Sequence, residues 1–243
     1  GPGAVPVGGP VTPRPAGATW NAATPFGSAT MNGVAYGRSI GSTARNSYVA
    51  VGDGGGVFTS LDNQKTWVSR TLPDGVAGKQ FNDVTFAYGR FVAVGNAGAI
   101  VYSPDGVTWT AATINSSTSL ANTNLTGLAF SGAMLMAVGQ GGTVLTSGDG
   151  VTWTAQATNI TQNLNTVAFS TSWTTTIPSA ATVAAFWVAA GDAGVVYASA
   201  DGVTWARVST FPNTVVYDVV TTGRLVVAAT ENGLWSGFGE SWQ

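Results

Sequence analysis

A seven-residue motif with the pattern Ser-x-Asp-Gly-Val-Thr-Trp occurs three times in this chain and limits what it can fold into. The copies span residues 103–109, 147–153 and 199–205, and a looser copy, one residue longer, spans residues 60–67. The tryptophans that end these copies follow one another at intervals of 42, 44 and 52 residues. Self-similarity at a fixed period of this size indicates a repeat architecture whose neighbouring units share a continuous core.

Each repeat has the same internal order. An alternating segment such as residues 82–87 comes first, and an apolar run that ends in glycine, such as residues 91–95, follows it. A tight turn, a short strand, the motif and a last strand complete the unit. Four short strands separated by turns predict a four-stranded antiparallel blade of a β-propeller. The apolar run is hydrophobic at every position, which is typical of a strand buried on both faces.

Five such units predict an all-β propeller of five four-stranded blades in a single domain over residues 18–243. The fifth unit is degenerate, and the sequence stops before a fourth strand is expected. Residues 18–23 resemble the fourth strand at residues 107–112, so we expect this N-terminal strand to complete the last blade and remove its open edge. Whether Trp20 or Trp242 fills the position is left open. Residues 1–17 are rich in proline and glycine and are predicted to be a linker or arm.

The residue types of the repeated motif suit a hairpin turn. The aspartate accepts backbone N–H groups, the glycine supplies a positive φ, the serine adds a side-chain hydrogen bond, and the tryptophan packs over the hairpin. An acid or metal site is the less favoured interpretation, because the aspartates lie on separate blades. The residues assigned this structural role are Ser60, Asp62, Trp67, Ser103, Asp105, Trp109, Ser147, Asp149, Trp153, Ser199, Asp201 and Trp205.

The motif resembles the Asp-box, or BNR repeat, of sialidase-like β-propellers, over about residues 18–243. That resemblance implies the propeller fold and a structural Asp-box. Sialidases of this kind use three arginines, a Tyr–Glu nucleophile pair and an acidic aspartate. Here both glutamates, Glu231 and Glu240, fall in the degenerate last unit, and no paired carboxylates suggest a glycosidase. We therefore expect no enzyme activity and no cofactor.

A second resemblance is to the Asp-box propeller that assists photosystem II assembly. It is similar in the motif and in the Val-Gly-x-x-Gly turn that follows the apolar run. That family has more blades and an arginine patch, which the sequence does not show.

Polar residues follow the apolar run in each unit. In a propeller this turn lies on the face that also carries the connections between blades. Five polar side chains near the central opening would suit a cation, a water molecule or a sugar, although tight turns favour the same residue types. The predicted ligand-binding residues are Asp53, Asn96, Gln140, Asp192 and either Thr230 or Glu231.

A tryptophan without a role in the repeat, Trp173, lies in an insertion at residues 170–182. It either stacks on a sugar ring or partner, or folds back onto its own blade. The connections between blades, at residues 70–80, 113–124, 157–163 and 209–213, are rich in Ser, Thr and Asn, as loops that recognise a polar surface often are.

Composition excludes several classes of function. Charged residues make up only 8% of the 243 residues, the net charge is −2, and no basic cluster suits nucleic acid or an anionic membrane. Histidine and cysteine are absent, which removes the commonest general base and any thiolate metal site. No apolar run approaches the length of a membrane span.

The sequence therefore favours a non-catalytic recognition or structural domain. Our first hypothesis is a propeller on a bacteriophage virion, of the tail-fibre type, or on a cell surface, which binds a glycan or protein receptor and forms a homotrimer if it belongs to a fibre. The alternative is a secreted or periplasmic bacterial propeller that scaffolds a protein partner. A sialidase-like hydrolase is the least favoured.

Overall fold

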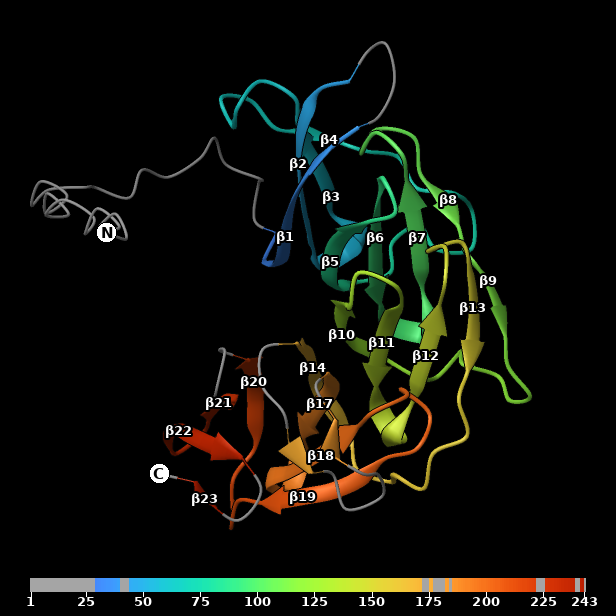
Figure 1. The fold of residues 1–243 in the computed structure, drawn as a ribbon. Coiled ribbons are helices and arrows are strands. Elements are labelled where there is room, and N and C mark those ends of the chain that lie inside the picture. The colour runs from blue at the N-terminus through green and yellow to red at the C-terminus, as the bar shows by residue number, and fades with distance from the viewer. Residues whose placement is uncertain are drawn as a thin grey trace, which may run out of the picture.

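The computed structural model describes residues 29–39, 44–171, 175–176, 182–183, 185–221, 226–238 and 241–242. Within these residues the secondary structure is strands, turns and four three-residue 3-10 turns. Five antiparallel sheets stand around a common centre (Figure 1), with the first strand of each sheet nearest that centre. This arrangement confirms the all-β propeller architecture that the repeat predicts.

Each sheet is one repeat, and we number the blades in chain order. Blade 1 contains β1 (Met31–Arg38), β2 (Asn46–Gly52), β3 (Val57–Ser60) and β4 (Val68–Ser69). Blade 2 contains β5 (Phe81–Ala87), β6 (Arg90–Gly95), β7 (Ile100–Ser103) and β8 (Thr110–Ala111). Blade 3 contains β10 (Leu125–Phe130), β11 (Leu135–Gly139), β12 (Val144–Ser147) and β13 (Thr152–Ala155). Blade 4 contains β14 (Leu164–Ser170), β17 (Phe186–Gly191), β18 (Val195–Ser199) and β19 (Ala206–Thr210), and blade 5 contains β20 (Val216–Thr221), β21 (Val226–Thr230), β22 (Gly233–Phe238) and β23 (Ser241–Trp242).

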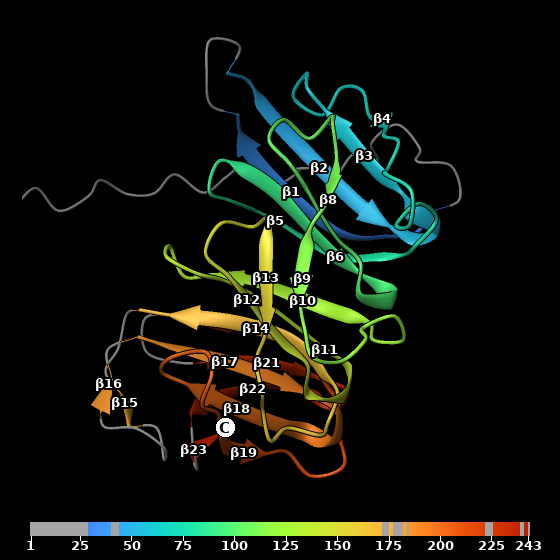
Figure 2. The ribbon, with the colours of Figure 1, turned by 90° about the vertical axis from the view of Figure 1, so that its right-hand side faces the viewer.

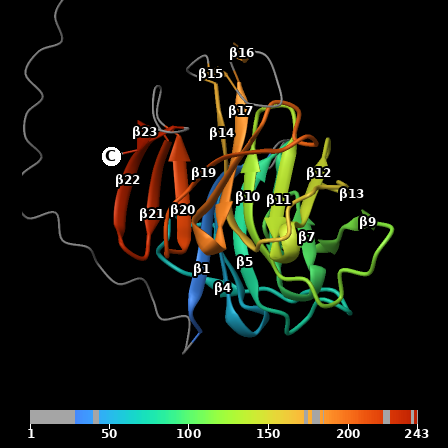
Figure 3. The ribbon, with the colours of Figure 1, turned by 90° about the horizontal axis from the view of Figure 1, so that it is seen from below.

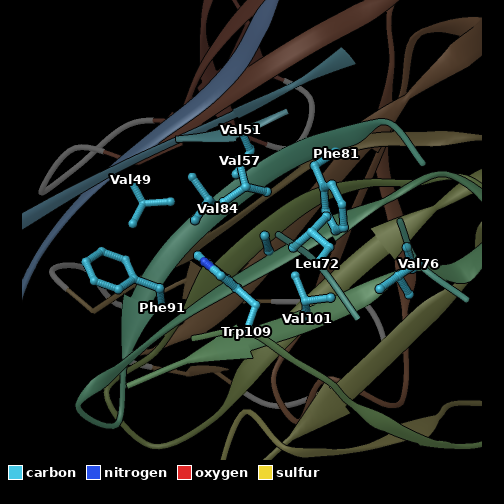
Figure 4. Close-up of a cluster of buried hydrophobic side chains, with 12 residues drawn as sticks. Val49, Val51, Val57, Leu72, Val76, Phe81, Val84, Phe91, Val101 and Trp109 are labelled. Carbon is cyan, nitrogen blue, oxygen red and sulfur yellow. The ribbon is translucent and has the colours of Figure 1, made fainter. Parts of the chain in front are cut away.

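The hydrophobic core lies between blades. The blades stack face to face (Figure 2), and each of four buried clusters joins one blade to the next. Between blades 1 and 2, Val49 and Val51 pack with Phe81, Phe91 and Trp109 (Figure 4). Fully burying a side chain of this size contributes about 1.5–3 kcal/mol. Because each cluster needs residues of two blades, a blade depends on its neighbour for its stability.

Two insertions differ from the loops that the sequence predicts. The connection from blade 2 to blade 3 contains β9 (Thr113–Asn115), which pairs in parallel with β13 and adds a fifth strand at the outer edge of blade 3. The insertion in blade 4 contains a short hairpin of β15 (Thr175–Thr176) and β16 (Thr182–Val183). Trp173 lies outside the described residues.

The prediction that the chain stops before a fourth strand of blade 5 is wrong. β23 pairs with β22, through Gly237 with Trp242 and Phe238 with Ser241. β23 therefore holds the position that the sequence analysis gave to residues 18–23. Only two residues separate Phe238 from Ser241 in the sequence.

The described blades form an open arc. β1 lies beside β5, β5 beside β10, β10 beside β14 and β14 beside β20, and no comparable contact joins β20 to β1 within the described chain. Figure 3 shows the blades from below, with blade 5 at one edge. The outward faces of the terminal blades are correspondingly exposed: Val34 is 68% exposed, whereas Val84, its equivalent in blade 2, is 5% exposed. β23 occupies the position in blade 5 at which the segment with Trp20 was expected, and that segment itself lies outside the described residues.

The glycine that ends the second strand of blades 1–4 is required by a close backbone approach. The residue before the first strand passes directly over it, so a Cβ built at Gly139 would lie 2.3 Å from the carbonyl oxygen of Asn124. At Gly52, Gly95 and Gly191 the corresponding distances are 2.0, 2.1 and 1.9 Å. The backbone of Gly139 is extended, with φ −171°, so contact and not conformation excludes a side chain there.

We therefore expect Gly139→Ala to lower the free energy of unfolding by about 3 kcal/mol, because the backbone of β10 must move to admit the methyl group. Gly148→Ala is the matched control, since a Cβ there meets nothing within 4 Å. Urea denaturation of both variants measures the difference. Equal stability of the two variants would contradict the steric explanation.

Candidate binding site at the centre of the ring

The polar residues predicted after the apolar runs lie on one face of the ring. Each of four begins a 3-10 turn between the second and third strands: Asp53–Gly55, Asn96–Gly98, Gln140–Gly142 and Asp192–Gly194. In blade 5 the backbone N–H of Glu231 donates to the carbonyl of Val215 at 3.0 Å, as Asp53 N–H donates to Thr30 at 3.0 Å. Glu231, and not Thr230, therefore holds the fifth equivalent position.

The side chains at four of these positions are hydrogen-bonded to the framework. Asp53 accepts from Asn32 Nδ2 at 3.2 Å, and Asn96 accepts from Asn82 Nδ2 at 2.9 Å. Gln140 Oε1 accepts the backbone N–H of Asn124 at 3.0 Å. Asp192 accepts from Asn163 at 2.8 Å and from Asn165 at 3.1 Å. These four side chains orient the start of the first strand of their blades. Other residues lie nearer the centre of the ring.

Those other residues occupy a β-bulge near the start of the first strand of every blade. The pairing register shifts between the first and third residues of β1, β5, β10, β14 and β20, which leaves the second residue unpaired. A bulge frees a side chain from the alternation of the sheet and redirects it. The five bulge residues are Asn32, Asn82, Thr126, Asn165 and Tyr217.

Four of the bulge side chains bind the backbone of the next blade. Each donates to the carbonyl oxygen of the first residue of the next inner strand, and we call this bond the latch. The latches run from Asn32 to Phe81 at 2.9 Å, from Asn82 to Leu125 at 2.7 Å, from Thr126 to Leu164 at 2.6 Å and from Asn165 to Val216 at 2.9 Å. Tyr217 of blade 5 is 57% exposed and makes no such bond within the described chain. The latches therefore join the same consecutive blades that the hydrophobic clusters join.

The latch gives a direct test of this role. We expect Asn82→Ala to lower the free energy of unfolding by about 2 kcal/mol, because it leaves the carbonyl of Leu125 without that donor. Tyr217→Ala, at the equivalent position without a latch, is expected to change stability by less than about 0.5 kcal/mol. Thermal and urea unfolding of both variants provide the measurement. A Tyr217→Ala variant as unstable as Asn82→Ala would count against the latch.

A cavity of about 330 Å³ lies among the bulge residues. It brings together residues from all five inner strands: Asn32, Asn82, Asp83, Thr126, Gly127, Leu128, Asn165, Thr166, Val167, Tyr217 and Asp218. We call it the central cavity. Sequence reasoning placed the candidate ligands in the turns and missed this set. The signal was present as a polar residue in the second position of four of the five first strands.

Two carboxylates of the central cavity differ in their surroundings. Asp83 accepts the N–H of Leu128 in blade 3 at 2.8 Å and the N–H of Val84 at 2.8 Å. Burial raises the pKa of Asp83 to about 6, against the lowering effect of these two hydrogen bonds, and the charge of Asp218 adds to the rise. Asp218 is exposed and accepts from the hydroxyl of Thr166 at 2.7 Å. The cavity thus contains one half-buried and one exposed acid.

The raised pKa of Asp83 predicts a specific pH dependence. The folded protein holds the Asp83 proton more tightly than the unfolded chain, so this group stabilises the fold below about pH 4, and that stability is lost as pH rises through about 6. The loss amounts to at most about 3 kcal/mol. We expect Asp83→Asn to remove this slope in denaturant unfolding measured between pH 4 and 7. An unchanged slope in the variant would assign the pH dependence to another group.

Most hydrogen-bond donors of the central cavity already bond to acceptors within the protein, whereas its carboxylates have acceptor positions left for a ligand. The amide nitrogens of Asn32, Asn82 and Asn165 each donate two hydrogen bonds, one to a turn side chain and one to the next blade. An amide has only two such hydrogens, whereas a carboxylate has about four acceptor positions. Within the described residues no three His, Cys, Asp or Glu side chains gather as a metal site. The cavity is therefore suited to a donor-rich, positively charged group.

The aspartates of the repeated Ser-x-Asp turns lie on the opposite face, each bonded within its own turn. Asp105 accepts the N–H groups of Val107 at 2.8 Å and Thr108 at 3.0 Å, and Ser103 donates to it at 3.0 Å. Asp149 and Asp201 make the same three bonds. In the longer copy, bonds from the hydroxyl and N–H of Thr66 lower the pKa of Asp62 to about 2. Trp109 and Trp153 donate from Nε1 to the glycine carbonyl of their own turns.

The connections before and after blade 3 line a shallow cavity of about 280 Å³. Its walls carry several hydroxyl and amide groups, contributed by Ser116, Ser117, Thr118, Thr143, Gln156 and Thr158. The cavity is part of the surface that the sequence predicts to recognise a polar ligand.

Comparison with known proteins agrees with this geometry. No protein-family model matches the sequence, and no curated protein matches it. The structure is similar to YCF48 bound to D1 peptide, with a TM-score of 0.59 and 18% identity, over 88% of this chain and 66% of that one. It is also similar to the WD40 β-propeller domain of Doa1, with a TM-score of 0.62 and 13% identity, over 90% and 68% of the two chains. The fold is that of a β-propeller.

A third similar structure, the C-terminal WD40 domain of Sif2, has a TM-score of 0.57 and 13% identity, over 85% of this propeller and 54% of that chain. This propeller therefore spans between about half and about two thirds of the three chains.

No helix in the described part of the propeller is long and apolar enough to cross a membrane.

Proposed function

We propose that this chain is a non-catalytic β-propeller that binds a protein partner, and that a basic side chain of the partner enters the central cavity. The observation that carries the proposal is the excess of acceptors there. The amide donors are used by the latches, and Asp83 and Asp218 add negative charge. A lysine ammonium supplies three donors and one positive charge in a compact group.

Asp218 is the group that such an ammonium meets first. Its side chain is exposed, and Thr166 and the N–H of Val219 hold one of its oxygens, Oδ1. The carboxylate is thus fixed in orientation before a ligand binds. Tyr217, exposed beside it, offers a ring face on which the methylene groups of a lysine pack.

The comparisons support a partner that is a protein. YCF48 has been solved with a D1 peptide bound to it, so a chain of similar fold takes a peptide. The resemblance of the Asp-box turns to the propeller that assists photosystem II assembly favours the same class of function, a scaffold for another polypeptide.

The test is selection from a random peptide library against the intact propeller. We expect lysine-containing peptides to be enriched, and Asp218→Asn to weaken their binding at least tenfold in fluorescence anisotropy, because it removes the accessible charge. Asp74→Asn, an exposed aspartate outside the cavity, is the matched control. Binding should also weaken as salt is raised. Enrichment of peptides without lysine, or equal binding by Asp218→Asn, would overturn the proposal.

A glycan is the second candidate ligand, and the hydroxyl-lined cavity between the connections before and after blade 3 is the observation in its favour. A glycan array probed with the same protein separates the two candidates. The virion, cell-surface or periplasmic setting and a trimeric assembly stay predictions of the sequence.

A further inference from the structure

A larger cavity, of about 410 Å³, lies on the opposite face of the propeller, where the Asp-box turns are. It is located between blades 1 and 2, remote from the central cavity, and shares no residue with it. Its lining consists of Ser39, Arg45, Leu61, Arg70, Pro104, Asp105 and Val107. Two arginines in one cavity are notable in a chain with only nine basic residues.

The side chain of Arg70 has a buried hydrogen-bond donor, Nε, without a partner in the described residues. Its backbone N–H donates to the carbonyl of Val57 at 2.8 Å, which fixes the residue at the end of β4. Its side-chain Nε is buried and has no hydrogen-bond partner within the described chain. A buried donor without a partner destabilises the fold. An acceptor supplied by a ligand would remove that cost.

Arg45 contributes the second positive charge. The residue is held at the start of the second strand by Ser39, whose N–H donates to the carbonyl of Arg45 at 3.2 Å and whose hydroxyl accepts the N–H of Arg45 at 3.1 Å. Its side chain is exposed. Neither arginine forms an ion pair with an acidic side chain of the described chain.

Asp105 limits the charge of a suitable ligand. Although partial burial acts to raise it, the pKa of Asp105 lies below its ordinary value because of hydrogen bonds from the N–H groups of Thr108 and Val107 and from Ser103. Asp105 is therefore ionised at neutral pH. Two arginines and one aspartate leave a net charge of +1, which matches a monoanion better than a doubly charged phosphate.

We propose that this cavity binds a monocarboxylate that carries a small apolar group. The guanidinium fork of arginine matches the geometry of a carboxylate, so Arg70 and Arg45 hold the anion. Leu61, Pro104 and Val107 supply apolar walls for the rest of the ligand. A free organic acid and the C-terminal residue of a peptide share this chemistry. The site is independent of the proposed central cavity.

The experiment follows the Nε–H signals of the arginines in 15N-labelled protein by NMR. N-acetyl-leucine is the probe for a free acid, and N-acetyl-Ala-Ala-Leu is the probe for a peptide C-terminus. We expect a saturable shift of the Arg70 signal with at least one of the two probes. The probe that binds more tightly shows whether the ligand is a free acid or a peptide C-terminus. N-acetyl-leucinamide, which lacks only the charge, should give no saturable shift, and inorganic phosphate should bind more weakly.

Variants test the assignment. We expect Arg45→Gln and Arg70→Lys each to weaken binding of the better probe at least tenfold, and Arg207→Gln, an exposed arginine of β19, to leave binding unchanged. Arg45 is exposed, so its variant is expected to fold even if the Arg70 variant does not. Binding of the amide as tight as that of the acid, tighter binding of phosphate, or full binding by Arg45→Gln would overturn the proposal.

Discussion

The contact between consecutive blades is the interaction on which the rest of this propeller depends. Each of the four buried hydrophobic clusters of the described residues is shared by two blades, and each of the four latches crosses one of the same boundaries near the centre. The apolar clusters supply most of the stabilisation, since they bury whole side chains. The latches add direction, because a hydrogen bond to one carbonyl defines the register of one blade on the next.

This construction separates the two faces of the ring by chemistry. At the start of the first strands, the latches use the amide donors and leave carboxylate and carbonyl oxygens around Asp83 and Asp218. On the other face, the repeated Ser-x-Asp turns bind their own aspartates, and Nε of Arg70 has no hydrogen-bond partner within the described residues. One face is therefore suited to a cation, and the other has a place for an anion. Both properties follow from the hydrogen bonds that stabilise the blades and their turns.

Much of the fold could be predicted from the sequence, because the repeated motif places a turn and the glycine-ended run places a buried strand in each blade. The candidate site could be predicted only in part. The turn residues Asp53, Asn96 and Asp192 were found, but the structure uses them to orient the bulge residues. Asn82 and Asn165 were missed, since a bulge breaks the alternation by which a strand residue is assigned to a face. β23 was missed because its two residues are too few to show a strand pattern.

The sequence by itself determined the number of repeats, the strand order within blades 1–4 and the residues that close each Ser-x-Asp turn, because all of these depend on local spacing and turn chemistry. Tertiary structure decided what lies across a blade boundary. The carbonyl of Leu125 receives Asn82, and the N–H of Leu128 holds Asp83, although more than forty residues separate each pair. Such partners are selected by the packing of one sheet against the next, which brings distant backbone groups within hydrogen-bond distance only after the blades have stacked.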